Sequence, residues 1–234
     1  MEFRLRPARD HGLSPEARLR SLSRERGLGS LMVGSAWRML LRGYLATAHR
    51  LEVTGRETLP EPPFVMIANH ASHLDALVLS AVLRGAAARR GHALAAGDTF
   101  FGSTVTSAFA AYAVNALPVW RKRTRASELA TLRARLLEDG LVYILFPEGT
   151  RARDGVMARF QPGIGALVAG TEVPVVPCFL HGAFAAWPPH RRAPRPARLR
   201  LVIGAPLRFD AVPSGREGWE TVAQRGEDAV RALA

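Results

Sequence analysis

The sequence contains little cysteine, lysine or aromatic residue. Cys178 is its one cysteine, so no disulfide can form within the chain, which fits a reducing compartment. Lys122 is the one lysine, and arginine therefore carries almost all of the formal net charge of +12. A charge of this size attracts phosphate esters, acidic lipid headgroups or nucleic acid. Because only 7% of the residues are aromatic and the arginines are dispersed, we expect no nucleic-acid partner.

Long hydrophobic runs are also absent. Residues 1–20 alternate charges where a secretory signal peptide needs a continuous apolar segment, so we expect the protein to stay inside the cell. Residues 99–120 form the longest uncharged stretch, but polar residues, glycine and proline interrupt it, which favours a buried helix and a strand over a spanning helix. The G-x-S-x-G motif is missing too, and a serine nucleophile on an elbow turn has no support.

The remaining composition suits one globular domain. A chain of 234 residues, 48% of them hydrophobic, can bury one substantial core but is short for two catalytic domains. Residues 1–27 are polar and arginine-rich, and we expect a polar arm that is loosely docked at most. Residues 28–49 are predicted to form an amphipathic helix, and residues 50–234 to form the main domain.

The predicted helix has two interpretations. Its apolar residues form a broad face, while Ser35, Arg38, Arg42 and His49 fall on a narrow polar stripe. Such a helix can lie in a membrane interface with its arginines at the headgroups. It can equally be a helix that packs against the domain, and the pattern alone does not decide between the two.

The main domain alternates apolar strands with helices. We predict strands at 63–68, 92–96, 116–120, 141–146, 173–180 and 198–204. We predict helices at 74–85, 100–112, 126–139 and 162–170, and a polar helix at the C-terminus. This alternation predicts an α/β fold, a single domain with a mainly parallel or mixed central sheet flanked by helices.

The segment ANHASHLDAL, residues 68–77, places titratable groups directly after an apolar strand. In a continuous helix His70 and Asp75 would point about 140° apart, so they can meet only if the helix starts between them. Ser72 is a suitable N-cap, with Asp75 at the N3 position of a capping box, and His70 would then lie on the loop at the carboxyl edge of the sheet. The capping box alone could also explain Asp75. A metal pair of His70 and His73 lacks further ligands, and we predict no metal site.

A second polar segment, FPEGTR at 146–151, follows another apolar strand. Gly149 permits a tight turn, Thr150 offers a hydroxyl and an amide, and Arg151 offers a planar fork for a phosphate or carboxylate. The segment could be only a turn. However, two polar loops that leave strands at the same sheet edge would converge into one site.

The segments N-H-A-S-H-L-D (69–75) and F-P-E-G-T-R (146–151) resemble the first and third motifs of the glycerolipid acyltransferases with the H-x-x-x-x-D motif, typified by 1-acylglycerol-3-phosphate O-acyltransferases. Arg121 after ALPVW, F-Q-P-G (160–163) and V-P-V-V-P (173–177) extend the resemblance over about residues 50–207. Departures are Asn115 where the family usually has glycine, and Gln161 in place of a common lysine. They bear on acceptor identity more than on chemistry.

The resemblance implies an O-acyltransferase that moves a fatty acyl group from acyl-CoA or acyl carrier protein to the free hydroxyl of lysophosphatidate in phospholipid biosynthesis. Another lysolipid, an aminolipid or a glycolipid is the alternative acceptor, and an acyl-thioesterase is the alternative enzyme. The resemblance implies no cofactor beyond the acyl donor. It also implies a peripheral or monotopic location on the cytoplasmic side of the membrane, with the membrane surface as a partner.

The same resemblance assigns roles to particular residues. His70 would be the general base, and Asp75 would fix its tautomer and stabilise the imidazolium. Arg121 and Arg151 would hold the phosphate of the acceptor. Glu148 and Thr150 would position its glycerol part, and Gly149 completes the predicted substrate-binding set.

Overall fold

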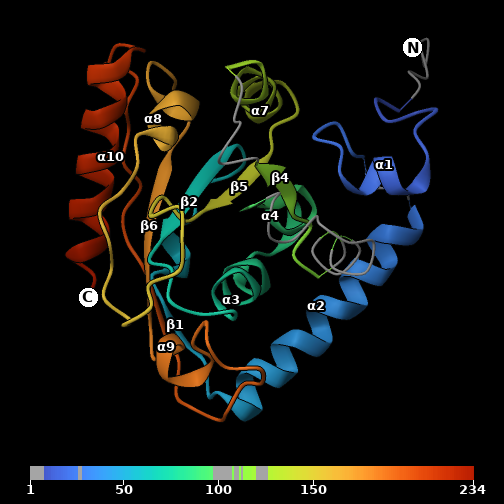
Figure 1. The fold of residues 1–234 in the computed structure, drawn as a ribbon, viewed down its shortest axis with the longest axis vertical. Helices are drawn as coiled ribbons and strands as arrows, with labels where there is room; N and C mark the ends of the chain where they lie inside the picture. The colour runs from blue at the N-terminus through green and yellow to red at the C-terminus, as the bar shows by residue number, and fades with distance from the viewer. Residues whose placement is uncertain (1–7, 26–27, 97–106, 108–110, 112, 120–125) are drawn as a thin grey trace.

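The computed structural model describes residues 8–25, 28–96, 107, 111, 113–119 and 126–234 (Figure 1). Within these ranges, seven strands form one sheet in the order β1-β7-β6-β2-β5-β3-β4. Every neighbouring pair is parallel except β6 and β7, which are antiparallel. The strands are β1 (Glu52–Thr54), β2 (Phe64–Ala68), β3 (Gly91–Ala96), β4 (Leu117–Val119), β5 (Val142–Leu145), β6 (Val175–His181) and β7 (Arg200–Ile203).

Helices cover both faces of this sheet. They are α1 (Pro15–Leu19), α2 (Leu28–Ala48), α3 (Asp75–Val82), α4 (Gly85–Arg90), α7 (Ala126–Glu138), α8 (Gly163–Val168), α9 (Ala183–Ala186) and α10 (Arg216–Arg231), with a 3-10 turn at Arg56–Thr58. The predicted single α/β domain with a mixed sheet flanked by helices is confirmed. The helix predicted at 100–112 falls largely outside the described residues.

Two apolar layers hold the domain together, one on each face of the sheet. All five residues of β2 are buried, as expected for a central parallel strand, and they alternate between the layers. Phe64 and Met66 face the layer that contains α2 and α3, while Val65 and Ile67 face the layer that contains α7, α8 and α10. The core is therefore continuous across the strand that leads into the first polar segment.

The register of the central strands fixes where the site forms. Strand β2 pairs in parallel with β5, with Phe64 opposite Val142 and Ile67 opposite Leu145. Parallel neighbours end at the same edge of a sheet, so the loops that follow these two strands begin side by side. This register explains why the two polar segments converge, as the sequence predicted.

Helix α2 packs against α3, and its polar stripe contributes to that packing. Arg42 donates from Nε to the carbonyl of Ala81 at 2.7 Å and from Nη2 to the carbonyl of Leu83 at 2.6 Å. His49 is fully buried, and its ring nitrogens lie within hydrogen-bond distance of the Tyr44 hydroxyl and a backbone carbonyl. Arg42 satisfies carbonyls at the end of α3, which favours the packing interpretation for this part of the polar stripe.

The opposite face of α2 is apolar and exposed. Met32, Met39 and Leu40 are 74%, 68% and 66% exposed, while Leu41 and Leu45 on the inner face are buried. Exposed apolar side chains at this spacing form one stripe along a helix. Within the described ranges, no helix combines the length and the apolar character needed to cross a lipid bilayer.

The described part of the N-terminal arm is docked more firmly than the sequence predicted. Arg24 is buried and donates from Nη2 to the side chain of Asn115 at 3.0 Å and to the carbonyl of Ala116 at 2.7 Å. Arg135 on α7 donates in turn to the carbonyl of Leu22. Composition did not reveal this docking, because an arginine that binds carbonyls looks the same in the sequence as a solvated one.

Candidate active site

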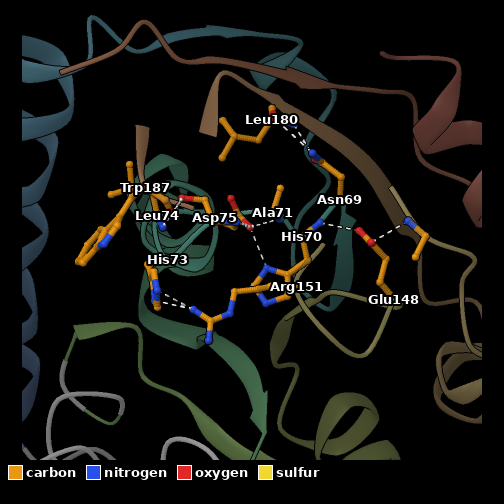
Figure 2. A network of polar contacts seen from close by, with 12 residues as sticks. Asn69, His70, Ala71, His73, Leu74, Asp75, Glu148, Arg151, Leu180 and Trp187 are labelled. Carbon is orange, nitrogen blue, oxygen red and sulfur yellow. Dashed lines mark hydrogen bonds and ion pairs between the residues drawn. The ribbon is translucent and has the colours of Figure 1, made fainter. Parts of the chain in front are cut away.

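His70 and Asp75 meet at the carboxyl end of β2 (Figure 2). The His70 Nδ1 lies 2.8 Å from the Asp75 Oδ2; Asp75 is fully buried and the His70 side chain is 19% exposed. The His70 ring stacks on Phe146, with ring centroids 4.2 Å apart and planes inclined by 17°. The pair forms because α3 begins at Asp75, so the helix start lies between the two residues as predicted.

One oxygen of Asp75 accepts three hydrogen bonds. Besides His70, the backbone N–H groups of Ala71 and Ser72 donate to Oδ2, each at 2.8 Å. These donors compensate a buried negative charge that would otherwise be costly. The Asp75 Oδ1 is also buried, and it has no hydrogen-bond partner among the described residues.

The predicted capping role of Ser72 is wrong, because α3 starts later than the sequence indicated. Leu74 occupies the N-cap position, without a side-chain hydrogen bond to the first turn. The Ser72 hydroxyl donates to the carbonyl of Trp187 at 2.8 Å, and it accepts from the N–H of Leu74 at 3.1 Å. Asp75 still reaches back to the Ser72 N–H, as the acidic member of a capping box does.

The hydrogen bond to Asp75 defines the tautomer of His70. An ionised carboxylate can only accept, so Nδ1 carries the proton and Nε2 keeps its lone pair. His70 lines a cavity of about 410 Å³, and no described residue is hydrogen-bonded to its Nε2. The arrangement provides a base whose free nitrogen can accept a proton from a bound molecule.

Glu148 fastens the second loop to the backbone of His70. Its Oε1 accepts from the His70 N–H at 2.6 Å, and its Oε2 accepts from the Ala158 N–H at 2.8 Å. The Ala152 N–H donates to the His70 carbonyl at 2.8 Å, so both backbone polar groups of His70 bind this loop. Burial raises the pKa of Glu148, although the two backbone donors favour its ionised form.

The role predicted for Glu148 is therefore corrected. The carboxylate is buried, both of its oxygens bind backbone amides, and it is not among the residues that line the cavity. It holds two loops together and does not face a glycerol group. The sequence could not reveal this, because the partners of Glu148 depend on how the loops meet in space.

Gly149, Thr150 and Arg151 all line the cavity mouth. Gly149 has a φ of +74°, in the left-handed region, and its N–H donates to the carbonyl of Phe146 at 3.0 Å to close the turn. A side chain at this position would be strained, which explains the glycine. Arg121, the other arginine predicted to bind phosphate, lies outside the described residues.

His73 is a site residue that sequence reasoning missed. The Arg151 Nη1 lies 2.5 Å from Nδ1 and 3.0 Å from Nε2 of His73, as Figure 2 shows. His73 lines the cavity beside His70. From the sequence, His73 was considered as a metal ligand paired with His70, and the one available signal for another role was its position within the same motif.

The cavity has a polar mouth and an apolar wall. His70, His73, Thr150 and Arg151 are at the mouth. Much of the wall comes from α3, β3, β4, β5, α7 and α8, and its aliphatic side chains include Leu77, Leu94, Val119, Leu129, Leu132, Leu145, Ile164 and Leu167. The V-P-V-V-P segment (173–177) does not line the cavity, because its strand residues are buried in the core.

Cys178 lies apart from this site. It is fully buried on β6 and does not line the cavity. Burial in apolar surroundings raises the pKa of its thiol, which opposes thiolate formation. The cysteine therefore packs in the core and is not placed to act as a nucleophile.

The chain also matches a known protein family over the residues that build this site. A family model described as Acyltransferase matches residues 50–181, more than half of the chain and both polar segments. The chain belongs to the acyltransferase family.

This chain has relatives that are named 1-acyl-sn-glycerol-3-phosphate acyltransferases. It is 29% identical over 180 residues to the 1-acyl-sn-glycerol-3-phosphate acyltransferase of Pseudomonas aeruginosa, covering 77% of this chain and 66% of that protein. It is 32% identical over 131 residues to the 1-acyl-sn-glycerol-3-phosphate acyltransferase alpha of Ovis aries, covering 55% of this chain and 44% of that protein. The chain thus corresponds to only part of each relative.

A solved structure has the same fold as this chain. The crystal structure of the 1-acyl-sn-glycerophosphate (LPA) acyltransferase PlsC from Thermotoga maritima superposes with a TM-score of 0.67. The match covers 91% of this chain and 83% of the Thermotoga protein, at 23% sequence identity. At this identity the likeness establishes a shared fold.

The bonds of Glu148 lead to a prediction about the position of His70. Glu148→Gln retains one acceptor oxygen and turns an NH₂ group toward the other backbone donor, at a cost of about 1–3 kcal/mol in the free energy of unfolding. Because His70 would shift, turnover should fall about tenfold to a hundredfold. Thermal unfolding and acyl-transfer rates measure the two effects.

Glu227→Gln is the matched control. Glu227 also binds a backbone N–H, that of Phe160 at 2.8 Å, but it has no hydrogen bond to the His70 loop. It should lose comparable stability and keep its turnover. If Glu148→Gln kept its turnover as well, the bond to His70 would have no positioning role.

Proposed function

We propose that this protein is an O-acyltransferase that moves a fatty acyl group from acyl-CoA or acyl carrier protein to the free hydroxyl of lysophosphatidate in phospholipid biosynthesis. The observation that carries the proposal is the His70–Asp75 pair, 2.8 Å apart at the mouth of a cavity with an apolar wall, in a chain of the acyltransferase family. The names of the relatives from Pseudomonas and sheep support the choice of acceptor.

The chemistry needs a base because an alcohol is a weak nucleophile. His70 Nε2 accepts the hydroxyl proton while the alcohol oxygen attacks the carbonyl carbon of the thioester. The carbon–sulfur bond then breaks, and the imidazolium returns its proton to the thiolate that leaves. Asp75 stabilises the imidazolium through the Nδ1–H bond at 2.8 Å. No covalent acyl-enzyme is required.

The mouth and the wall of the cavity fit the two ends of such substrates. Arg151 offers a planar guanidinium to the acceptor phosphate, and Thr150 and Gly149 line the same opening. We assign Arg121 to the same phosphate by its place in the family motif. The apolar side chains of α7 and α8 would bury the acyl chain, since burial of each methylene contributes about 0.8 kcal/mol.

The outer face of α2 supports a peripheral location on a membrane. Met32, Met39 and Leu40 lie exposed along one stripe, while the inner face packs on α3. An apolar stripe on a helix that cannot span a bilayer suits burial at the boundary between headgroups and acyl chains. We place this contact on the cytoplasmic side, where lysophosphatidate and the acyl donor would meet.

His70 tests the base. His70→Ala should lower turnover with palmitoyl-CoA and lysophosphatidate by about a hundredfold to ten-thousandfold while the fold stays intact. His181→Ala is the control, because His181 bonds to the carbonyl of Leu233 and does not line the cavity. Near-normal turnover of His70→Ala, with circular dichroism unchanged in both variants, would exclude the mechanism.

Arg151 tests the acceptor. Loss of one charge-assisted bond to phosphate, worth roughly 1.5–3 kcal/mol, should raise the KM for lysophosphatidate in Arg151→Ala by about tenfold to a hundredfold. Arg151→Lys should fall between wild type and Arg151→Ala, because lysine keeps the charge and loses the planar fork. Thioester hydrolysis without acceptor should change far less, because that reaction leaves the phosphate position empty.

Arg153→Ala provides the matched control for this series. Arg153 is exposed, lies on the same loop and does not line the cavity, so its loss should leave both KM values unchanged. Should Arg151→Ala raise only the KM for acyl-CoA, the arginine would bind the phosphates of the donor. A panel of other lysolipids in the same assay separates lysophosphatidate from the alternative acceptors.

The outer face of α2 tests the membrane contact. The double variant Met39→Asp, Leu40→Asp should reduce sedimentation with anionic vesicles at least tenfold, roughly the loss expected from two apolar side chains. Leu137→Asp on α7, which is 46% exposed, is the control and should bind normally. Higher salt should weaken the binding that remains. Equal binding of the double variant and wild type would restrict α2 to packing.

A further inference from the structure

His73 is held on three sides at the cavity mouth. The Arg151 Nη1 lies 2.5 Å from its Nδ1, and its Nε2 lies 3.4 Å from the carbonyl oxygen of Pro189. The ring also packs against Trp187, with centroids 5.0 Å apart and planes inclined by 42°. Pro189 and Trp187 belong to the connection after α9, so His73 joins Arg151 to a third loop.

These contacts require a neutral imidazole. A guanidinium can only donate, so a ring nitrogen that binds it must keep a lone pair. The Pro189 carbonyl can only accept, which favours the ring proton on Nε2. The Arg151 Nη1 lies 2.5 Å from Nδ1 and 3.0 Å from Nε2, so Nδ1 is the nearer acceptor for Arg151. An imidazolium would have no lone pair left and would carry the same charge as Arg151.

We propose that neutral His73 is a positioning residue that holds Arg151 at the cavity mouth, and that its protonation releases Arg151 and weakens binding of a phosphorylated acceptor. The inference rests on the proposed function of Arg151 in binding phosphate. It adds a residue outside the predicted site and a dependence on pH that the base alone would not produce.

The groups around His73 favour the neutral form. Burial is the largest effect and lowers the pKa of His73, and the positive charge of Arg151 lowers it further. The carbonyl of Pro189 and the carboxylate of Asp75 act in the opposite direction, and His70 adds to the lowering. With the pKa below the ordinary value for histidine, His73 is neutral at neutral pH and becomes charged as the pH falls.

The test follows KM and kcat over a pH series from about pH 8 to well below the ordinary pKa of histidine, because the pKa of His73 is lowered from that value. In wild type the KM for lysophosphatidate should rise as the pH falls, while the KM for palmitoyl-CoA stays nearly constant. Because the phosphate of the acceptor changes its own charge in this range, the contribution of His73 is the difference in this KM between wild type and a variant that does not titrate at position 73.

Three variants separate positioning from packing. His73→Asn places an amide oxygen close to the position of Nδ1 and does not titrate, so its KM for lysophosphatidate should be near wild type at high pH and should rise less than that of wild type as the pH falls. His73→Phe keeps a ring but no acceptor, and should raise this KM about tenfold at high pH. His190→Asn, next to Pro189, is the control and should behave as wild type.

A spectroscopic readout tests the pairing without catalysis. In full-length protein with ¹⁵N-labelled histidine, His73 should show the Nε2–H tautomer at neutral pH and titrate at lower pH than the same residue in Arg151→Ala. An unchanged His73 titration in Arg151→Ala overturns the pairing. So does a wild-type KM for lysophosphatidate in His73→Phe, or a pH dependence in His73→Asn equal to that of wild type. If the protein acylates no phosphorylated acceptor, the proposed function fails, while the titration still decides the pairing.

Discussion

Two hydrogen bonds to the backbone of His70 join the loops that follow β2 and β5. The N–H of His70 donates to Glu148, and its carbonyl accepts from Ala152. Parallel pairing brings the two loops together, and Asn69 ties the end of β2 to the backbone of Leu180 on β6. His70 can therefore direct its side chain toward the cavity, because its main chain has no freedom to move separately from the loop that carries Arg151. The His70–Asp75 geometry and the arginine position both depend on this junction.

Much of the architecture could be predicted because the central strands are buried on both faces. The apolar runs at 63–68, 141–146 and 173–180 correspond to β2, β5 and β6, and the break between His70 and Asp75 correctly places the helix start. Strand β1 was not predicted, because Glu52–Thr54 is short and two of its three residues are exposed. The sequence also placed α3 slightly early, since nothing in it indicates that the Ser72 hydroxyl bonds to Trp187.

The site was harder to predict where a residue binds another part of the protein and not the substrate. Glu148 was predicted to face the substrate but binds backbone amides, and His73 was passed over although it contacts Arg151. The hydrophobic pattern of α2 also could not show which side of the helix faces the domain, because its buried and exposed faces are both apolar. In addition, Arg42 faces the domain, where it donates to α3 carbonyls. In contrast, the structure explains a departure from the family motif. The φ of Asn115 is +49°, a value that favours glycine and tolerates asparagine, and this accounts for asparagine in place of the family's glycine.

The docked arm also affects how the sheet meets its surroundings. Among the described residues, strand β4 is the last in the strand order and pairs with β3 on one side. Arg24 occupies the carbonyl of Ala116, at the approach to this strand, and brings a bulky cation there. Charged residues at a sheet margin are a common protection against edge-to-edge aggregation. A segment that was predicted to be loosely docked at most thus supplies a hydrogen bond to the backbone directly before this last strand.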